Sequence, residues 1–177
     1  MGAYYQAVLH DENESIMYGT HSMNVGCKLM EHSYTDNSYC NSILHKLLDN
    51  PRQVTWLCDY HEMDGVTALT WDEVEEQPIT DTSRDLPEDY YILNHTKQVY
   101  IHIAELITKY RFKEDTDWII HPIPLLCNSD TTRMGGGDYR KEDSRRSTWC
   151  GDLLEVSTEA RQNFTNVSED CMFFEGE

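Results

Sequence analysis

A segment around three consecutive glycines carries the densest basic cluster of the chain. The fourteen positions from 133 to 146 hold five of the fourteen Lys and Arg residues. Glycines let a backbone approach a ligand closely and expose N–H groups that hold a phosphate or carboxylate. Neighbouring arginines add a bidentate clamp for the same groups. We therefore predict a site for an anionic ligand or nucleotide, formed by Arg133, Gly135, Gly136, Gly137, Asp138, Arg145 and Arg146.

This glycine segment matches neither of the common phosphate-binding patterns. No Gly-Lys-Ser or Gly-Lys-Thr follows it, as a P-loop requires, and it is not a Gly-x-Gly-x-x-Gly sequence between a strand and a helix. A second interpretation stays open, in which the segment is a surface loop whose arginines pair with the acidic remainder of the chain.

A group of potential metal ligands follows a predicted strand at Asp59, His61, Glu62 and Asp64. Carboxylate and imidazole side chains suit Mg, Mn or Zn. Alternation along a strand places Asp59 and His61 on one side and Glu62 on the other, and acidic residues are common throughout this chain. We predict no cofactor, and we keep Asp59, His61 and Asp64 as weak candidates for metal binding.

The six cysteines and eight histidines form no metal or redox motif. No two cysteines have C-x-x-C spacing, and no two histidines have i, i+4 spacing. We expect reduced thiols, several of them buried, because free cysteine behaves as a small apolar residue. A Cys–His pair that meets only in the fold stays open, but a nucleophilic thiol needs exposure and a lowered pKa. The sequence indicates neither.

Charge is the feature that bears most on function. The chain has 32 Asp and Glu against 14 Lys and Arg, a formal net charge of −18. A field of this sign repels phosphate backbones and attracts basic protein surfaces. We therefore predict a basic protein partner that itself handles nucleic acid, with no direct nucleic-acid binding. The most acidic segment, 62–89, supplies the predicted partner-binding residues Asp72, Glu73, Glu75 and Glu76. The alternative is that the acidity serves solubility alone.

The sequence predicts one α+β domain over residues 1–156, followed by an acidic tail over 157–177. Apolar spacing predicts a principal helix at about 38–49, capped by Asp36 or Asn37 and packed on a face of the sheet. The sheet should be mixed and mainly antiparallel, with about five to seven strands. We expect a strand that passes into a helix near Ala104, a short helix over 70–77, and a tail anchored by Met172, Phe173 and Phe174. The expected strands cover 4–9, 16–18, 25–30, 54–60, 90–94, 98–103, 118–126 and 148–156.

No apolar run approaches the ~18 residues of a membrane span, and the first residues lack the basic and apolar regions of a signal peptide. We therefore expect a cytoplasmic protein with no membrane association.

Six stretches of the chain give it a resemblance to a known group of proteins. The stretches are Lys28–Ser33, Trp56–Tyr60, Asn94–Lys97, Trp118–Pro122, Met134–Tyr139 and Ser144–Asp152. Over about residues 3–156 the chain is similar to a group of small uncharacterised proteins that bacteriophages and bacterial mobile elements carry. The resemblance implies a phage-encoded protein in the host cytoplasm, in a class where inhibitors of host defence, such as anti-CRISPR proteins, are common.

Three functions follow, in order of preference. The first is an acidic interaction protein that inhibits a basic, nucleic-acid-handling host protein, with nucleic-acid mimicry as its means. The second is a small anionic-ligand or nucleotide binder that uses the glycine segment with Arg145 and Arg146. The third is a metal-dependent hydrolase that uses the Asp59–Asp64 cluster. A binding protein is thus favoured over an enzyme.

Overall fold

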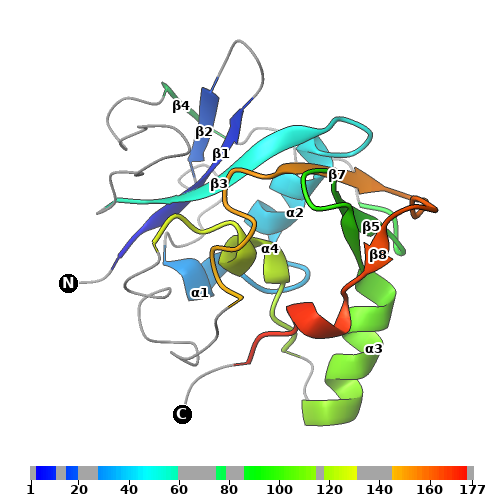
Figure 1. Cartoon of the computed structure of the whole chain (residues 1–177). Helices are drawn as coiled ribbons and strands as arrows, with labels where there is room; N and C mark the ends of the chain where they lie inside the picture. Colours follow the sequence, from blue (N-terminus) through cyan, green and yellow to red (C-terminus); the bar gives the residue numbers. More distant parts are fainter. Residues whose placement is uncertain are drawn as a thin grey trace.

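The protein is built on a single sheet, drawn in Figure 1. The computed structural model describes residues 3–10, 15–19, 28–59, 75–78, 86–114, 118–130 and 145–174. Within them the sheet has eight strands in the order β4-β2-β1-β3-β7-β5-β6-β8. The strands are β1 (Tyr5–His10), β2 (Ser15–Gly19), β3 (Arg52–Cys58), β4 (Glu75–Pro78), β5 (Tyr91–Asn94), β6 (Val99–His102), β7 (Leu153–Ser157) and β8 (Thr165–Asn166).

The pairing of the strands is mixed and mainly antiparallel. Every inner pair is antiparallel, and only the two outermost pairs, β2 with β4 and β6 with β8, are parallel. The predicted α+β class is therefore confirmed. The expected five to seven strands are present, and the two-residue β8 extends the sheet by one edge strand.

The two halves of the sheet are joined by a short ladder. Strand β3 pairs with β7 only at Arg52 and Gln53. Further along β3, Trp56 takes its backbone partners from outside the named strands, donating to the carbonyl of Cys127 and accepting from the N–H of Ser129. The end of α2 also reaches β7, because the Val156 N–H donates to the carbonyl of Leu47.

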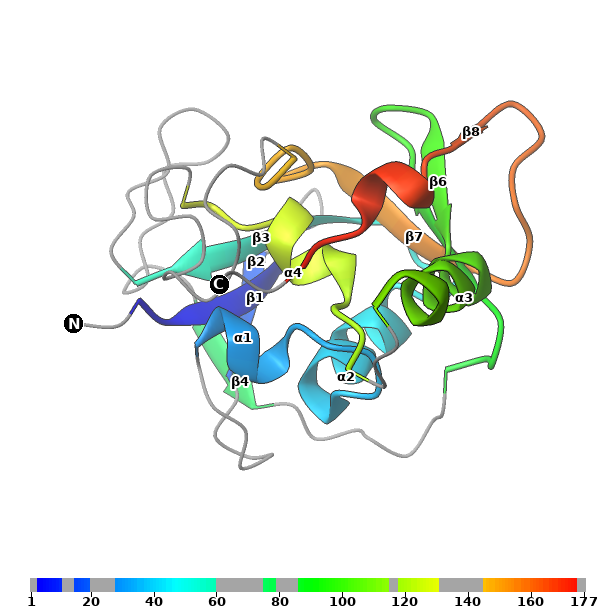
Figure 2. The ribbon, with the colours of Figure 1, turned by 90° about the horizontal axis from the view of Figure 1, so that it is seen from below.

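Four helices lie on one side of the sheet, below it in Figure 1 and toward the viewer in Figure 2. They are α1 (Leu29–His32), α2 (Ser38–Lys46), α3 (Ile103–Glu114) and α4 (Pro122–Leu126), and a short 3-10 turn, η3 (Glu169–Cys171), follows later in the chain. None of the helices in the described ranges is long and apolar enough to cross a lipid bilayer.

The core lies between this helical layer and the sheet. Alternate residues of β1 and β3, including Tyr5 and Trp56, point into it together with Tyr39 and Ile43 of α2. The opposite face of the sheet carries a small separate cluster of Val8, Met17 and Leu57. Because successive strand residues face opposite sides, β1 contributes to both clusters and is buried along its whole length.

Helix α2 forms where its apolar spacing predicts. The Asn37 side chain caps its start by accepting a hydrogen bond from the N–H of Cys40, at 3.0 Å. The predicted passage from strand to helix is confirmed too, since α3 follows β6 without a break. At 12 residues α3 is longer than α2, which has nine.

Four local predictions were wrong. Residues 148–151 form a turn, and the strand expected over 148–156 begins only at Leu153. Residues 122–126 form α4 rather than a strand, because His121 caps this helix and Pro122 occupies its first turn, where proline is favoured. Leu29 and Met30 belong to α1, whose Glu31 carboxylate accepts from the Lys28 N–H. Residues 75–77 lie in β4 instead of a helix, because the open edge of β2 supplies parallel backbone partners.

The chain after residue 156 packs onto the same core. Cys171, Met172 and Phe173 are buried, and Phe174 packs against them. The Tyr110 hydroxyl of α3 donates to the Phe173 carbonyl and accepts from the Phe173 N–H. The anchoring role expected of Met172 and Phe173 is therefore confirmed. The boundary at residue 156 stays a prediction.

Candidate functional site

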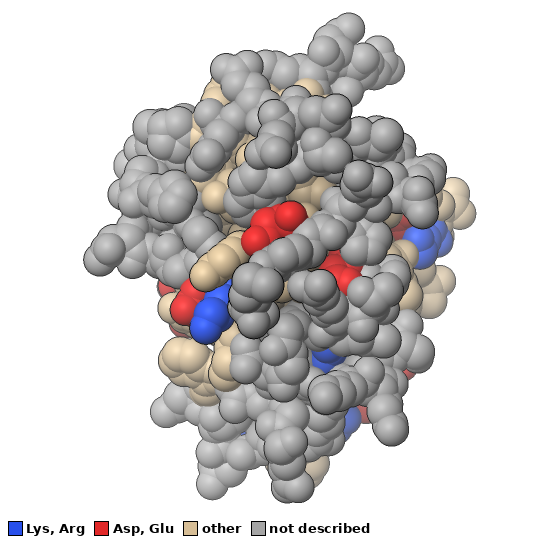
Figure 3. Space-filling view, turned by 90° about the vertical axis from the view of Figure 1, so that its left-hand side faces the viewer, with Lys and Arg blue, Asp and Glu red and all other residues tan. Residues whose placement is uncertain are grey.

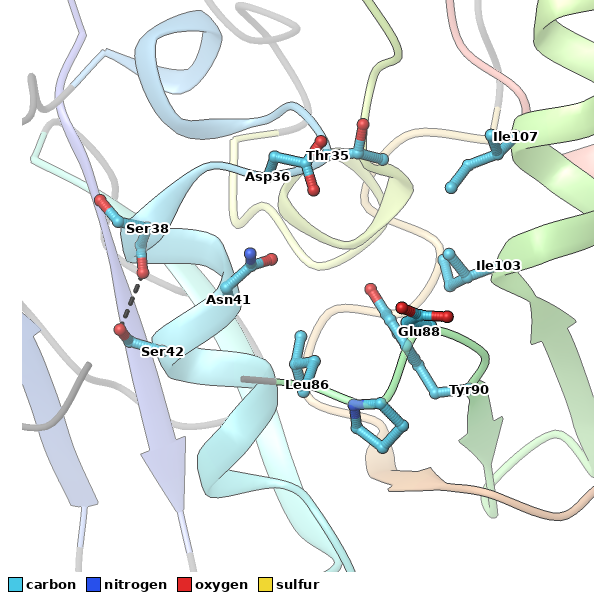
Figure 4. Close-up of a pocket in the computed structure, with 11 residues that line it drawn as sticks. Thr35, Asp36, Ser38, Asn41, Ser42, Leu86, Glu88, Tyr90, Ile103 and Ile107 are labelled. Carbon is cyan, nitrogen blue, oxygen red and sulfur yellow. Dashed lines mark hydrogen bonds between the residues drawn. The ribbon is translucent and has the colours of Figure 1, made fainter. Parts of the chain in front are cut away.

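A cavity of about 390 Å³ opens between the start of α2, the approach to β5, and α3. Its volume lies within the range of about 300–1,000 Å³ that is usual for small-ligand sites. Three segments far apart in the sequence line it, namely 35–42, 86–90 and 103–107 (Figure 4). The fold therefore creates a concavity that no local sequence pattern encodes.

The cavity has an apolar side and a polar side. Leu86, Ile103 and Ile107 provide aliphatic surface, and Ile103 is buried in the core. Asp36 and Glu88 are exposed, and they carry the only charged side chains among the described residues that line the cavity. The polar lining is completed by Thr35, Ser38, Asn41 and Ser42. The lining is thus more polar than that of most small-molecule sites, in which apolar side chains predominate and a few polar groups orient the ligand.

Tyr90 carries a buried hydroxyl that faces this cavity. It is 6% exposed, and Figure 4 shows its hydroxyl pointing into the space that Asp36 and Asn41 border. The hydroxyl lies 3.3 Å from His121 Nε2. The other ring nitrogen of His121, Nδ1, accepts from the N–H of Ile123 at 3.3 Å. In the neutral imidazole the proton therefore resides on Nε2, which donates to the Tyr90 oxygen.

This assignment leaves the Tyr90 proton free for a ligand. Complete burial lowers the pKa of His121 to about 3, so the ring is neutral near neutral pH. Burial, the Cys40 thiol and the Asp36 carboxylate raise the pKa of Tyr90, so its hydroxyl keeps its proton. Among the described residues its one hydrogen-bond contact is His121. Tyr90 thus acts as a hydrogen-bond donor toward the cavity.

The electrostatics of the cavity favour a cation. Neither Asp36 nor Glu88 forms an ion pair with any described residue. The nearby start of α2 contributes about half a positive charge, and the Asn37 cap already satisfies part of it. Two full carboxylate charges outweigh that contribution. Asp36 also has a φ of 67°, a conformation in which Asp and Asn are enriched.

Sequence reasoning did not find this cavity. Asp36 was considered only as a helix cap, a role that Asn37 takes instead, and Tyr90 only as a strand residue. The available signal was weak, consisting of an acidic residue beside an alternative cap and a tyrosine that follows Glu88 and Asp89. Only the fold shows that Asp36 and Tyr90 line the same space.

The predicted anion site falls mostly outside the described residues, which do not include 131–144. The two arginines that follow differ in their surroundings. Arg145 donates to the carbonyl of Asp170, and its guanidinium stacks over the Phe173 ring at 4.8 Å. Arg146 is buried, at 6% exposure. The anion site stays a prediction, and Arg145 has a structural role in holding the C-terminal segment.

The predicted metal ligands are only partly described. Asp59 accepts a hydrogen bond from the N–H of Tyr4 at 2.9 Å, which closes the end of the β1–β3 pair. His61, Glu62 and Asp64 lie outside the described residues. Within the described ranges no group of three or more His, Cys, Asp or Glu side chains is arranged to hold a metal ion.

The five described cysteines are free thiols, and four of them are buried. Burial raises the pKa of Cys40 and of Cys127, and it raises the pKa of Cys150 to about 11. An activated nucleophile needs the opposite shift. These thiols are therefore packing residues.

The predicted partner-binding residues lie at the edge of the described structure. Asp72 and Glu73 fall outside it, and Glu75 and Glu76 lie in β4. In the C-terminal segment Glu169 pairs with Lys109 and Lys113 of α3. On the face shown in Figure 3 some described Asp and Glu side chains are visible at the surface.

No protein-family model, curated protein or solved structure matches this chain. The resemblance to proteins of bacteriophages and mobile elements therefore stays a prediction.

Proposed function

We propose that the protein binds a basic, nucleic-acid-handling host protein through its acidic surface and inhibits it, as a phage-type anti-defence protein in the host cytoplasm would. The observation that carries this proposal is the net charge of −18. Such a field attracts basic surfaces and speeds their encounter with the protein. Carboxylates spread over loops and edges would then occupy a groove built for a phosphate backbone.

The distribution of charge supports the proposal. The described ranges contain ten of the fourteen basic residues but only half of the acidic ones. Most of these bases already have intramolecular contacts, so they leave the acidic excess uncompensated. The contacts are Lys46 over the Tyr18 ring, Lys97 with Asp152, Lys109 and Lys113 with Glu169, Arg161 with Glu155, and Arg145 with the Asp170 carbonyl.

The two other predicted functions have less support. Arg145 of the predicted anion site is engaged with the C-terminal segment. Asp59 of the predicted metal cluster is engaged with the backbone of Tyr4. Neither residue is poised for a ligand in the described structure.

The test is to capture a partner from a bacterial lysate, purify it, and measure its association and dissociation rates by surface plasmon resonance over a salt series. We expect association to slow steeply with salt, because exposed charges are screened beyond about 8–10 Å at physiological ionic strength. Reversing Asp72, Glu73 and Glu76 to Lys should slow association by about tenfold or more and change dissociation less.

The matched control reverses Asp49, Glu159 and Asp170, which are exposed acids in other parts of the fold. This triple variant has the same net charge as the first and should retain most of the association rate. Binding that is independent of salt, or equal effects of the two triple variants, would leave the acidity as a solubility feature and refute the proposal.

A further inference from the structure

The cavity between α2, β5 and α3 combines three features that together specify a ligand. Its aliphatic wall of Leu86, Ile103 and Ile107 requires an apolar body. The Tyr90 hydroxyl requires a hydrogen-bond acceptor, because the neutral His121 ring already donates to its oxygen. Asp36 and Glu88 require a positive charge at the exposed rim.

The Tyr90 hydroxyl is an observation independent of the two acids. Tyr90 is more than nine-tenths buried, and its hydroxyl points into the cavity. A buried donor without an acceptor is destabilising relative to one that is satisfied. A ligand acceptor at this position would offset that destabilisation, and the same position would reject a purely hydrocarbon ligand.

An anionic ligand does not fit this cavity. Among the described residues, no Lys, Arg or His lines the cavity. A carboxylate or phosphate at the rim would face the carboxylates of Asp36 and Glu88, which form no ion pair with a described residue.

We propose that this cavity is a binding site for a small organic cation, consisting of an apolar body with a hydrogen-bond acceptor at one end and a protonated amine at the other. The acceptor contacts the Tyr90 hydroxyl, the apolar body packs on Ile103 and Ile107, and the amine lies between Asp36 and Glu88. The site does not depend on the proposed protein partner.

The probes are tyramine, two analogues that each change one of its groups, and a peptide. Tyramine has the phenol oxygen, the ring and the amine. Phenethylamine lacks the acceptor, and 3-(4-hydroxyphenyl)propionate replaces the cation with an anion. The fourth probe, an N-acetylated Gly-Tyr-Arg-Gly amide, presents the same chemistry on a polypeptide. Binding is followed by amide chemical shifts in NMR titrations, which report both the affinity and the location.

We expect tyramine to bind with a dissociation constant of about 0.1–5 mM, the range for a ligand of about ten heavy atoms. Its shifts should be confined to residues around 35–42, 86–90 and 103–107. Phenethylamine should bind about three- to tenfold more weakly, and the propionate should not bind.

Comparable binding of the propionate, or shifts centred elsewhere, would overturn the proposal. Tighter binding of the peptide than of tyramine would assign the cavity to a polypeptide and overturn the small-ligand assignment.

Variants complete the test. Asp36→Asn with Glu88→Gln should weaken tyramine about five- to twentyfold, as expected for two exposed charge contacts. The control Asp89→Asn removes a neighbouring exposed acid that pairs with His102 and does not line the cavity, and it should change the affinity less than about twofold. Equal weakening of tyramine binding by the Asp36 and Glu88 substitutions and by the Asp89 control would refute the role of the two rim carboxylates.

Tyr90→Phe separates ligand contact from structure. It should weaken tyramine to the affinity of phenethylamine and leave phenethylamine itself unchanged. Equal weakening of both amines would show that the hydroxyl only supports the fold. Because this variant also leaves the buried His121 N–H without its acceptor, the Asp36 and Glu88 variants test the proposal independently. These titrations contain no partner protein, so their failure would not bear on the proposed interaction.

Discussion

Lowering the pH from about 7.5 to about 5 should destabilise the folded protein by about 4 kcal/mol, through two buried histidines. His32 and His121 are both fully buried. Desolvation lowers the pKa of each from 6.5 to about 3 in the folded state. The Nε2 of His32 accepts from the Trp56 indole N–H at 3.2 Å, and Nδ1 of His121 accepts the capping bond of α4, so protonation would also oppose these contacts.

The sign follows from where each state takes up protons. Between pH 6.5 and about 3 the unfolded chain protonates these rings and the folded protein does not. Stability is therefore complete above pH 6.5 and falls as the pH falls below it, by about 1.4 kcal/mol per unit for each histidine. Between 6.5 and 5 this amounts to about 2 kcal/mol for each ring. Burial also lowers the pKa of His10, which adds a loss of the same sign.

The assay is urea unfolding followed by circular dichroism at several pH values in this range. The lowered carboxyl pKa values of Glu105 and Glu169 act at more acidic pH, so this interval reports the histidines. A variant with His32→Gln and His121→Asn retains hydrogen-bond acceptors at both positions and should lose most of the pH dependence. A free energy of unfolding that stays constant from about pH 7 to 5 would refute the burial of these rings as neutral groups.

Two further predictions concern packing and thiol reactivity. Tyr110→Phe removes the hydroxyl that pairs with both backbone groups of Phe173, and it should lower the free energy of unfolding by about 2–4 kcal/mol. The control Tyr100→Phe, on a half-buried ring, should lower it by less than about 0.5 kcal/mol. Equal losses for the two variants in thermal or urea unfolding would contradict the contact. Cys40 and Cys127 are buried and have raised pKa values, so they should react with a thiol reagent only when the protein unfolds. Cys150, whose pKa is raised to about 11, should react only slowly at a pH near 8. Mass spectrometry of the labelled native protein checks this, and rapid native labelling of Cys40 would contradict it.

The sequence predicted those elements whose signals are local. Helix α2 follows from apolar residues such as Ile43 and Leu44 at helical spacing, with a cap at Asn37. Strand β3 follows from a run of apolar and β-branched residues between turn signals. The hairpin of β5 and β6 follows from two such runs around the turn at 95–98. In each case neighbouring residues carry both the propensity and the boundary.

The elements that the sequence missed depend on partners far along the chain. Residues 118–126 contain β-compatible residues and two prolines, which suit either an edge strand or the start of a helix. In the structure residues 122–126 form a helix that His121 caps, and the contact of His121 with Tyr90 holds the cap in place. Strand β4 exists because β2 offers it a parallel edge, which no pattern within 75–78 reveals. The candidate cavity is hidden for the same reason, since its three walls meet only in the fold.

The size of the net charge supports the proposal that the acidity serves to bind a partner. A small domain needs a net charge of only about 2–8 to remain soluble, and this chain carries −18. The excess adds self-repulsion, which opposes the compact state. Most bases in the described part of the chain are engaged in contacts such as Lys97 with Asp152 and Lys109 with Glu105. The described positive charge is thus largely used in packing, which supports the proposed binding of a basic partner.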